Sequence, residues 1–108
     1  MMALTKDFKE TIQLRAQRDP VFRKALLQEG ITCLLASEID TGKAVLRDYI
    51  NATIGFEELS KVLGKPSKSL MRMFGPKGNP HASNLFAVIG HLQKHEGVRL
   101  EVEAKTVA

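Results

Sequence analysis

Residues 56–80 read FEELSKVLGKPSKSLMRMFGPKGNP, and the glycines and prolines of this stretch decide the fold. Gly64 stands where a left-handed residue usually ends a helix, so the pattern predicts a two-turn helix over residues 56–63. Pro66 is typical of a helix start and predicts a second short helix over residues 66–74. Two short helices joined by a glycine-containing turn form the plan of a helix-turn-helix motif.

The second of these helices is predicted to carry the contact surface. Leu70, Met73 and Phe74 can anchor it to a core. In a helix-turn-helix motif the second helix lies in the major groove of DNA, where its outward side chains reach base edges. The residues expected to face outward are Ser67, Lys68, Ser69, Met71 and Arg72. The alternative is an ordinary solvated helix surface.

The loop GPKGNP that follows is predicted to approach the DNA backbone. Its glycines carry no side chain, so backbone N–H groups and nearby cations can come close to a phosphate. The residues predicted to contact phosphate are Lys61, Lys65, Lys77 and Asn79. An ordinary turn is the alternative, because Gly-Pro and Asn-Pro mark turns in many proteins.

Charge is distributed unevenly along the chain. The chain carries 16 Lys and Arg residues against 12 Asp and Glu residues, a formal net charge of +4. Residues 59–95 hold six of the cations and all three histidines but no acid. An acid-free segment of this length favours a surface that meets a polyanion such as DNA. A solvated basic face is the simpler alternative.

Helical periodicity covers most of the remaining chain. Apolar residues recur at helical spacing and predict helices near residues 6–17, 20–36, 40–53 and 82–95. The expected core residues of these helices are Phe8, Ile12, Ala16, Phe22, Leu26, Leu27, Ile31, Leu34, Leu35, Val45, Leu46, Tyr49, Ile50, Leu85, Phe86, Ile89 and Leu92. The expected fold is therefore all-α, a bundle of about six helices.

The C-terminal stretch VRLEV, residues 98–102, alternates apolar and polar residues and predicts one short β-strand. A single strand leaves both of its edges unpaired. Val98, Leu100 and Val102 are therefore expected to form a strand that pairs with a second subunit or with the sheet of a partner protein. An extended tail that pairs with nothing is the alternative.

At 108 residues the chain is long enough for one domain with a modest core. We expect a helical extension over residues 1–37, a DNA-binding core over residues 38–97 and the strand over residues 98–103. No apolar run approaches the roughly 20 residues needed to span a bilayer. The start of the chain, MMALTKDFKE, lacks the apolar core of a signal peptide, so we expect a cytoplasmic protein.

Several kinds of chemistry are not indicated by the sequence. Cys33, the single cysteine, is most simply a small buried side chain. His91 and His95 are spaced four residues apart on a predicted helix, but no third ligand is evident, so neither a metal nor a cofactor is predicted. We find no Ser-His-Asp or Cys-His arrangement, and we predict that the chain is not an enzyme.

The chain also resembles a known family. Residues 53–92, TIGFEELSKVLGKPSKSLMRMFGPKGNPHASNLFAVIGHL, are similar to the Xre/Cro-type helix-turn-helix domain. Residues 42–102, with the runs RDYINAT and KSLMRM, resemble more narrowly the HigA-like antitoxins called probable addiction module antidote proteins. The resemblance places the recognition helix on residues 66–74. It implies that the residues predicted to read bases are Ser67, Lys68, Ser69 and Arg72. Gly55 and Phe56 depart from the Thr-Gln of the Xre pattern, and Phe56 is expected to pack instead.

The resemblance implies a function as well as a fold. It implies a homodimer that binds an inverted-repeat operator in double-stranded DNA and represses the operon that encodes it. It also implies an antitoxin that neutralises a RelE/HigB-like toxin by direct binding. The alternative is an Xre-family or prophage transcriptional regulator without a toxin partner, which would share every DNA-binding feature.

Overall fold

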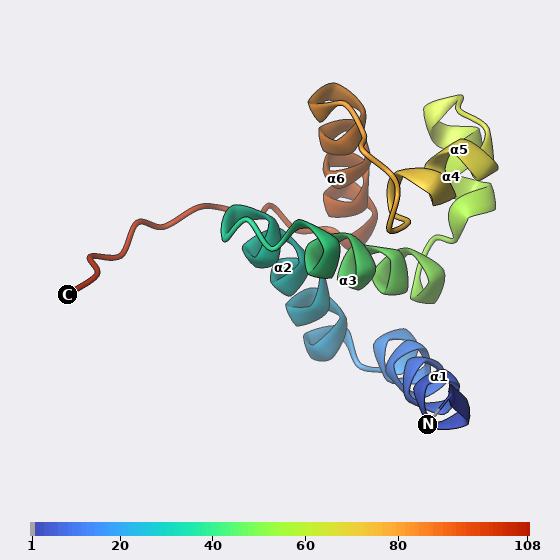
Figure 1. Cartoon of the computed structure of the whole chain (residues 1–108), viewed down its shortest axis with the longest axis horizontal. Coiled ribbons are helices and arrows are strands. Elements are labelled where there is room, and N and C mark those ends of the chain that lie inside the picture. Colours follow the sequence, from blue (N-terminus) through green and yellow to red (C-terminus); the bar gives the residue numbers. More distant parts are fainter. Residues whose placement is uncertain (1) are drawn as a thin grey trace.

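The computed structural model describes the backbone of residues 2–108 and the side chains of residues 10–108. Over these residues the fold is all-α, as predicted, with six helices and no strand. The helices are α1 (Met2–Arg18), α2 (Pro20–Leu35), α3 (Ile39–Ala52), α4 (Phe56–Leu63), α5 (Ser67–Met73) and α6 (Ala82–Glu96). In Figure 1, α3 crosses the middle of the molecule, α6 stands above it, and α4 and α5 lie together at the upper right.

Helix ends follow the local signals that the sequence carries. The Asp19 carboxylate accepts a hydrogen bond from the backbone N–H of Phe22 at 3.1 Å, and Pro20 is the first residue of α2. Gly64 and Gly97 end α4 and α6 in the left-handed conformation, with φ of 65° and 74°. A residue without a Cβ atom is favoured there. These signals explain why the predicted and observed boundaries agree closely from α2 onward.

Two glycines let α2 and α3 pack closely together. A Cβ atom on Gly30 would lie 2.7 Å from Cδ2 of Leu46, and one on Gly42 would lie 2.8 Å from Cδ2 of Leu34. Either atom would force its neighbour to move. A glycine inside a helix costs about 1 kcal/mol relative to alanine. The close contact between the two helices offsets that cost, so Gly30 is a packing residue.

One hydrophobic core receives side chains from α2 and from every later helix. Its buried members are Leu27, Leu46, Tyr49, Ile50, Phe56, Leu59, Leu70, Phe74, Val88 and Leu92. Since Leu70 and Phe74 belong to this core, α5 and its C-terminal end are fixed to the rest of the molecule. Phe56 is buried, as expected, and its ring centroid lies 6.2 Å from that of Phe74.

Two expected core residues are instead exposed. Leu35 is 65% exposed and Phe86 is 63% exposed, so placing them in the core was wrong. Leu85 and Ile89 share a helix face at a spacing of four residues, whereas Phe86 is rotated about 100° from Leu85 and lies at the edge of that face. The side chain of Phe8 lies outside the described residues.

The C-terminal segment after Gly97 is extended but is not a strand, and in Figure 1 it runs away from the helices. Val98 and Leu100 pack against the core, and the backbone N–H of Leu100 donates to Oε1 of Gln93 at 2.8 Å. Val102 is 78% exposed. The predicted strand is therefore absent from the described part of the single chain, because its first half is bound to the chain's own core.

A buried ion pair joins the four helices α1, α2, α3 and α6. Nε of Arg23 lies 2.9 Å from both carboxylate oxygens of Glu96, whose side chain is 3% exposed. Arg23 also donates to the carbonyl of Ala16 at 3.0 Å, and the Tyr49 hydroxyl donates to Glu96. The positive charge, the negative charge and the hydroxyl thus satisfy one another. We call Arg23, Tyr49 and Glu96 the Arg23 network.

Candidate nucleic-acid interface

The connection between α4 and α5 is a three-residue turn, residues 64–66. The backbone N–H of Gly64 donates to the carbonyl of Ser60 at 2.9 Å, and the N–H of Lys65 donates to the same carbonyl at 3.2 Å. The Ser60 hydroxyl in turn donates to the carbonyl of Lys65. Backbone and side chain therefore fix the turn together, which sets the direction in which α5 leaves it.

Helix α5 is anchored on one side and open on the other. Leu70 is fully buried and Phe74, directly after the helix, is 1% exposed. Lys68, Ser69 and Arg72 are exposed, and Ser67 is half-buried. Three of the four residues predicted to read bases therefore lie on one open surface of a helix that its apolar side holds in place.

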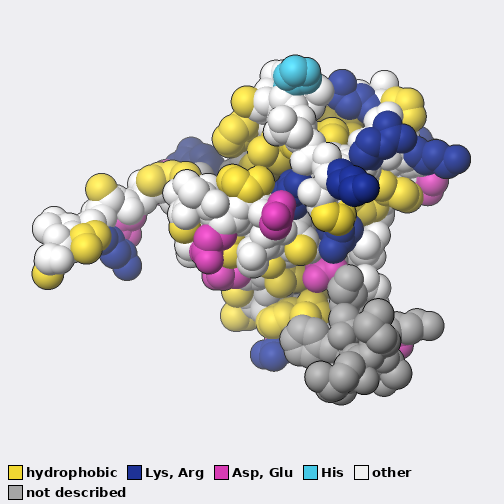
Figure 2. Space-filling model, viewed as in Figure 1, with side chains coloured by type: hydrophobic (Ala, Val, Ile, Leu, Met, Phe, Trp, Pro, Cys, Tyr) yellow, Lys and Arg dark blue, Asp and Glu magenta, His cyan; other side chains and the backbone are white. Residues whose placement is uncertain are grey.

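Cations gather over α4 and α5. Figure 2 shows dark blue Lys and Arg side chains concentrated at the upper right, where these two helices lie. We call Lys61, Lys65, Lys68, Arg72 and Lys77 the basic surface. Of the predicted phosphate contacts in this region, Lys61 is exposed and lies 3.4 Å from Glu58, whereas Lys65 is half-buried. An exposed pair such as Lys61–Glu58 is weak and leaves the lysine able to change partners.

The loop after α5 folds tightly back on the helix. The backbone N–H of Gly78 donates to the carbonyl of Gly75 at 3.0 Å, which closes a turn with Pro76 and Lys77 at its tip. A Cβ atom on Gly78 would lie 2.0 Å from the carbonyl oxygen of Arg72, a distance that the backbone cannot accommodate. Lys77 and Asn79, the two loop residues predicted to contact phosphate, are both exposed.

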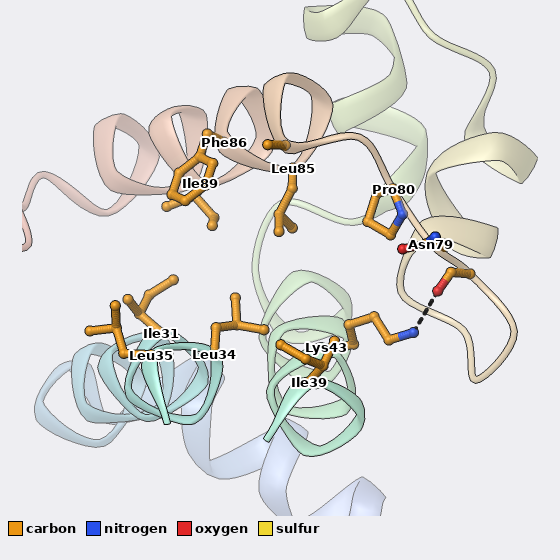
Figure 3. Close-up of a pocket in the computed structure, with 12 residues that line it drawn as sticks. Ile31, Leu34, Leu35, Ile39, Lys43, Asn79, Pro80, Leu85, Phe86 and Ile89 are labelled. Atoms are coloured by element: carbon orange, nitrogen blue, oxygen red, sulfur yellow. Dashed lines mark hydrogen bonds between the residues drawn. The ribbon is translucent and has the colours of Figure 1, made fainter. Parts of the chain in front are cut away.

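The sequence did not connect Lys43 and Arg47 with this loop. Lys43 of α3 is 3% exposed, and its ammonium donates to the carbonyls of Gly75 at 2.9 Å and Gly78 at 2.8 Å. Figure 3 shows the Lys43 side chain reaching across to the loop. Arg47, one turn further along α3, donates to the carbonyl of Phe74 at 3.3 Å. One sequence signal could have revealed the burial of Lys43: this charged residue lies on the same apolar face of α3 as Leu46.

An apolar groove of about 400 Å³ lies beside this loop, between α6 and the junction of α2 with α3. Its walls include the exposed side chains of Leu35, Ile39 and Phe86. The Phe86 side chain faces this groove from α6 in Figure 3. The sequence pattern predicted helices on both sides of the groove but not the groove itself.

Neither metal binding nor a membrane span is indicated in the described part of the chain. Among the described residues, no three His, Cys, Asp or Glu side chains gather as a metal site would require. No described helix is both long and apolar enough to cross a bilayer. Cys33 is buried, and burial raises the pKa of its thiol, which disfavours the reactive thiolate.

Comparison with known proteins adds no relative. No family model, no curated protein and no solved structure matches this chain.

Proposed function

We propose that this chain binds double-stranded DNA through a helix-turn-helix motif formed by α4 and α5. Helix α5 would lie in the major groove, with Ser67, Lys68, Ser69 and Arg72 facing base edges. Lys61, Lys65, Lys77 and Asn79 would contact the phosphates on either side of the groove. The function would be sequence-specific repression of the operon that encodes the chain.

The observation that carries this proposal is the two-sided character of α5. A helix that buries Leu70 and Phe74 and exposes Lys68 and Arg72 has a fixed position and a basic outer surface. Residues 59–95 contain no Asp or Glu, so no carboxylate from this part of the chain repels a DNA phosphate that approaches α5. A fixed helix reads base edges better than a mobile basic tail, because its backbone is already ordered before binding.

A homodimer belongs to the proposal, because one such motif covers only a short half-site. We propose that the extended segment from Val98 onward joins the two subunits, with Val102 as its exposed apolar contact. A chain truncated after Leu100 keeps the core contacts of Val98 and Leu100 and should be a monomer in light scattering. A truncated chain that remains a dimer would show that the dimer interface lies elsewhere. If Phe86→Glu then abolished the dimer, the interface would lie at the groove.

The DNA-binding proposal is tested with a duplex taken from directly upstream of the gene and a control duplex of scrambled sequence. Arg72→Ala should weaken binding to the upstream duplex by about 1–3 kcal/mol and reduce the preference over the control. Lys77→Ala should weaken both duplexes alike and lower the salt dependence of binding by about one counterion. Arg18→Ala removes an exposed arginine of α1 and should change neither. Parent-like binding by both Arg72→Ala and Lys68→Ala would refute the assignment of α5.

The antitoxin function is a further step that rests on the family resemblance alone. It predicts that the product of the neighbouring gene is a RelE/HigB-like toxin that forms a stable complex with this chain. Co-purification of the two proteins, with rescue of cell growth by the chain, would support it. A chain that binds its upstream DNA but neither binds nor counteracts that product would be an Xre-family regulator.

A further inference from the structure

Lys43 is the most completely buried charged side chain that the structure describes outside the Arg23 network. It reaches across 32 and 35 residues of sequence to the carbonyls of Gly75 and Gly78, the first and last residues of one turn. The carbonyl of Gly75 also accepts the N–H of Gly78, so both of its lone pairs are used. Lys43 therefore binds both ends of the turn that presents Lys77.

The carbonyls held by Lys43 and Arg47 create an electrostatic problem for a phosphate-binding loop. The C-terminal end of a helix carries a partial negative charge, because its last carbonyls lack partners within the helix. The Phe74 carbonyl lies at this end of α5, and the carbonyls of Gly75 and Gly78 belong to the turn that follows it. A phosphate approaching Lys77 and Asn79 would be repelled by these oxygens if their partial charge were not offset.

The positions of Lys43 and Arg47 meet this problem directly. Both donate to carbonyls of this end of α5 and its loop, at distances of 2.8–3.3 Å. The carboxylate of Asp40 lies 3.7 Å from the Lys43 ammonium, but its side chain is 86% exposed, so water weakens that pair. The buried ammonium therefore leaves a positive charge beneath the loop.

We propose that Lys43 is a positioning residue for phosphate binding, which never touches DNA but holds the loop 75–78 in shape and offsets the carbonyl charge behind it. This inference rests on the proposed DNA-binding function. The simpler reading is that Lys43 only adds stability to the fold. The two roles predict different behaviour of Lys77 and Asn79. If Lys43 positions the loop, their phosphate contacts depend on Lys43; if Lys43 only stabilises the fold, they do not.

The experiment compares the full chain with Lys43→Met, which removes charge and donors, and Lys43→Gln, which keeps a donor without the charge. Lys24→Met, at an exposed lysine of α2, is the matched control. Two quantities are measured. The first is amide hydrogen exchange at Lys77, Gly78 and Asn79, with Leu92 in the core as the internal reference. The second is the salt dependence of binding to a mixed-sequence duplex of about 24 base pairs, long enough for two half-sites.

We expect Lys43→Met to speed exchange at Gly78 about tenfold or more, with a smaller change at Leu92 in the core. The slope of log K against log salt should fall by about one for each phosphate that the variant no longer binds. Lys43→Gln should keep slower exchange than Lys43→Met yet show the same fall in slope, because the charge is gone. The Lys24→Met control should match the parent in both measurements.

The outcomes separate this inference from the proposed function. Binding by the parent with an unchanged slope in both Lys43 variants overturns the positioning role and leaves the DNA-binding function standing. Failure of the parent to bind any duplex overturns both. If Lys43→Met does not fold, Lys43→Gln alone decides: a parent-like slope in that folded variant refutes the inference.

Discussion

Arg23 and Lys43 are both cations whose hydrogen bonds are partly buried, and their partners differ in kind. Arg23 is paired with a buried carboxylate, so the Arg23 network is close to neutral and ties four helices together. Lys43 is held mainly by backbone carbonyls of a loop, so its charge is only partly offset. In the Arg23 network the charged groups pair with one another within the fold. Lys43 instead leaves a positive charge beneath a surface, which suits a surface that meets an anion.

The difference suggests a division of labour along the molecule. The Arg23 network joins α1, α2, α3 and the C-terminal end of α6, and no residue of the basic surface takes part in it. Lys43 and Arg47 lie on the same helix as Tyr49 but serve the loop after α5. Changes in the Arg23 network should therefore alter stability, and changes around Lys43 should alter the basic surface.

Glu96→Ala should reduce stability more than Gly78→Ala or Tyr49→Phe. Removing the carboxylate leaves the half-buried Arg23 charge and the buried Tyr49 hydroxyl without their partner. Breaking a buried pair costs about 3–5 kcal/mol, and we expect about 3 kcal/mol because Arg23 is 22% exposed. Urea denaturation measures the change. Glu101→Ala, which removes an exposed partner of Arg99, is the control and should have no measurable effect; equal losses in both variants would contradict a special role for Glu96.

A smaller effect is expected from the pair Gly78→Ala and Gly90→Ala. The methyl group at residue 78 would overlap the carbonyl of Arg72, so the loop must move, at a cost of about 1–3 kcal/mol. Residue 90 lies within α6 and has open space around it, so alanine there should stabilise the helix by up to about 1 kcal/mol. Thermal melts compare the two. A neutral Gly78→Ala would show that the loop is not packed as described.

The weakest effect is confined to high pH and concerns Tyr49. Burial, and then its hydrogen bond to Glu96, raise the pKa of this phenol above its ordinary value near 10. The folded chain therefore keeps the proton more tightly than the unfolded chain. The resulting stability is fully present below about pH 10 and is lost as pH rises above it.

The chain has one Tyr and no Trp, so the absorbance of tyrosinate reports on this residue alone. The folded chain should titrate at higher pH than the chain in concentrated urea. The Tyr49 phenol contributes part of the stability loss above about pH 10. That part should be absent in Tyr49→Phe. Identical titration of the folded and unfolded chain would contradict the buried position of Tyr49.

Much of the fold could be predicted because local signals carry it. Asp19-Pro20, Gly64 and Gly97 end or begin helices through backbone requirements that a few neighbouring residues reveal. The anchoring of α5 through Leu70 and Phe74 followed from helical spacing. The same local reasoning placed Lys68 and Arg72 on an open surface, where the structure has them.

Most of what the sequence did not predict involves packing against the core or contacts between residues far apart in the chain. Period two in VRLEV predicts a strand, but the core of the same chain binds Val98 and Leu100 first. The pairing of Arg23 with Glu96 spans 73 residues, and nothing near either residue in the sequence points to the other. Lys43 finds its partners in backbone carbonyls, which every residue has and which no sequence pattern distinguishes.

DNA should meet this chain at α5 and its loop and not at the Arg23 network. Amide chemical shifts of the full chain, recorded by NMR while the upstream duplex is added, distinguish the two places residue by residue. We expect the largest shift changes at Lys68, Ser69, Arg72 and Lys77, with little change at Arg23 and Glu96. Shift changes centred on α1 and α2 with none in α5, or no change at any duplex concentration, would contradict the proposed DNA contact.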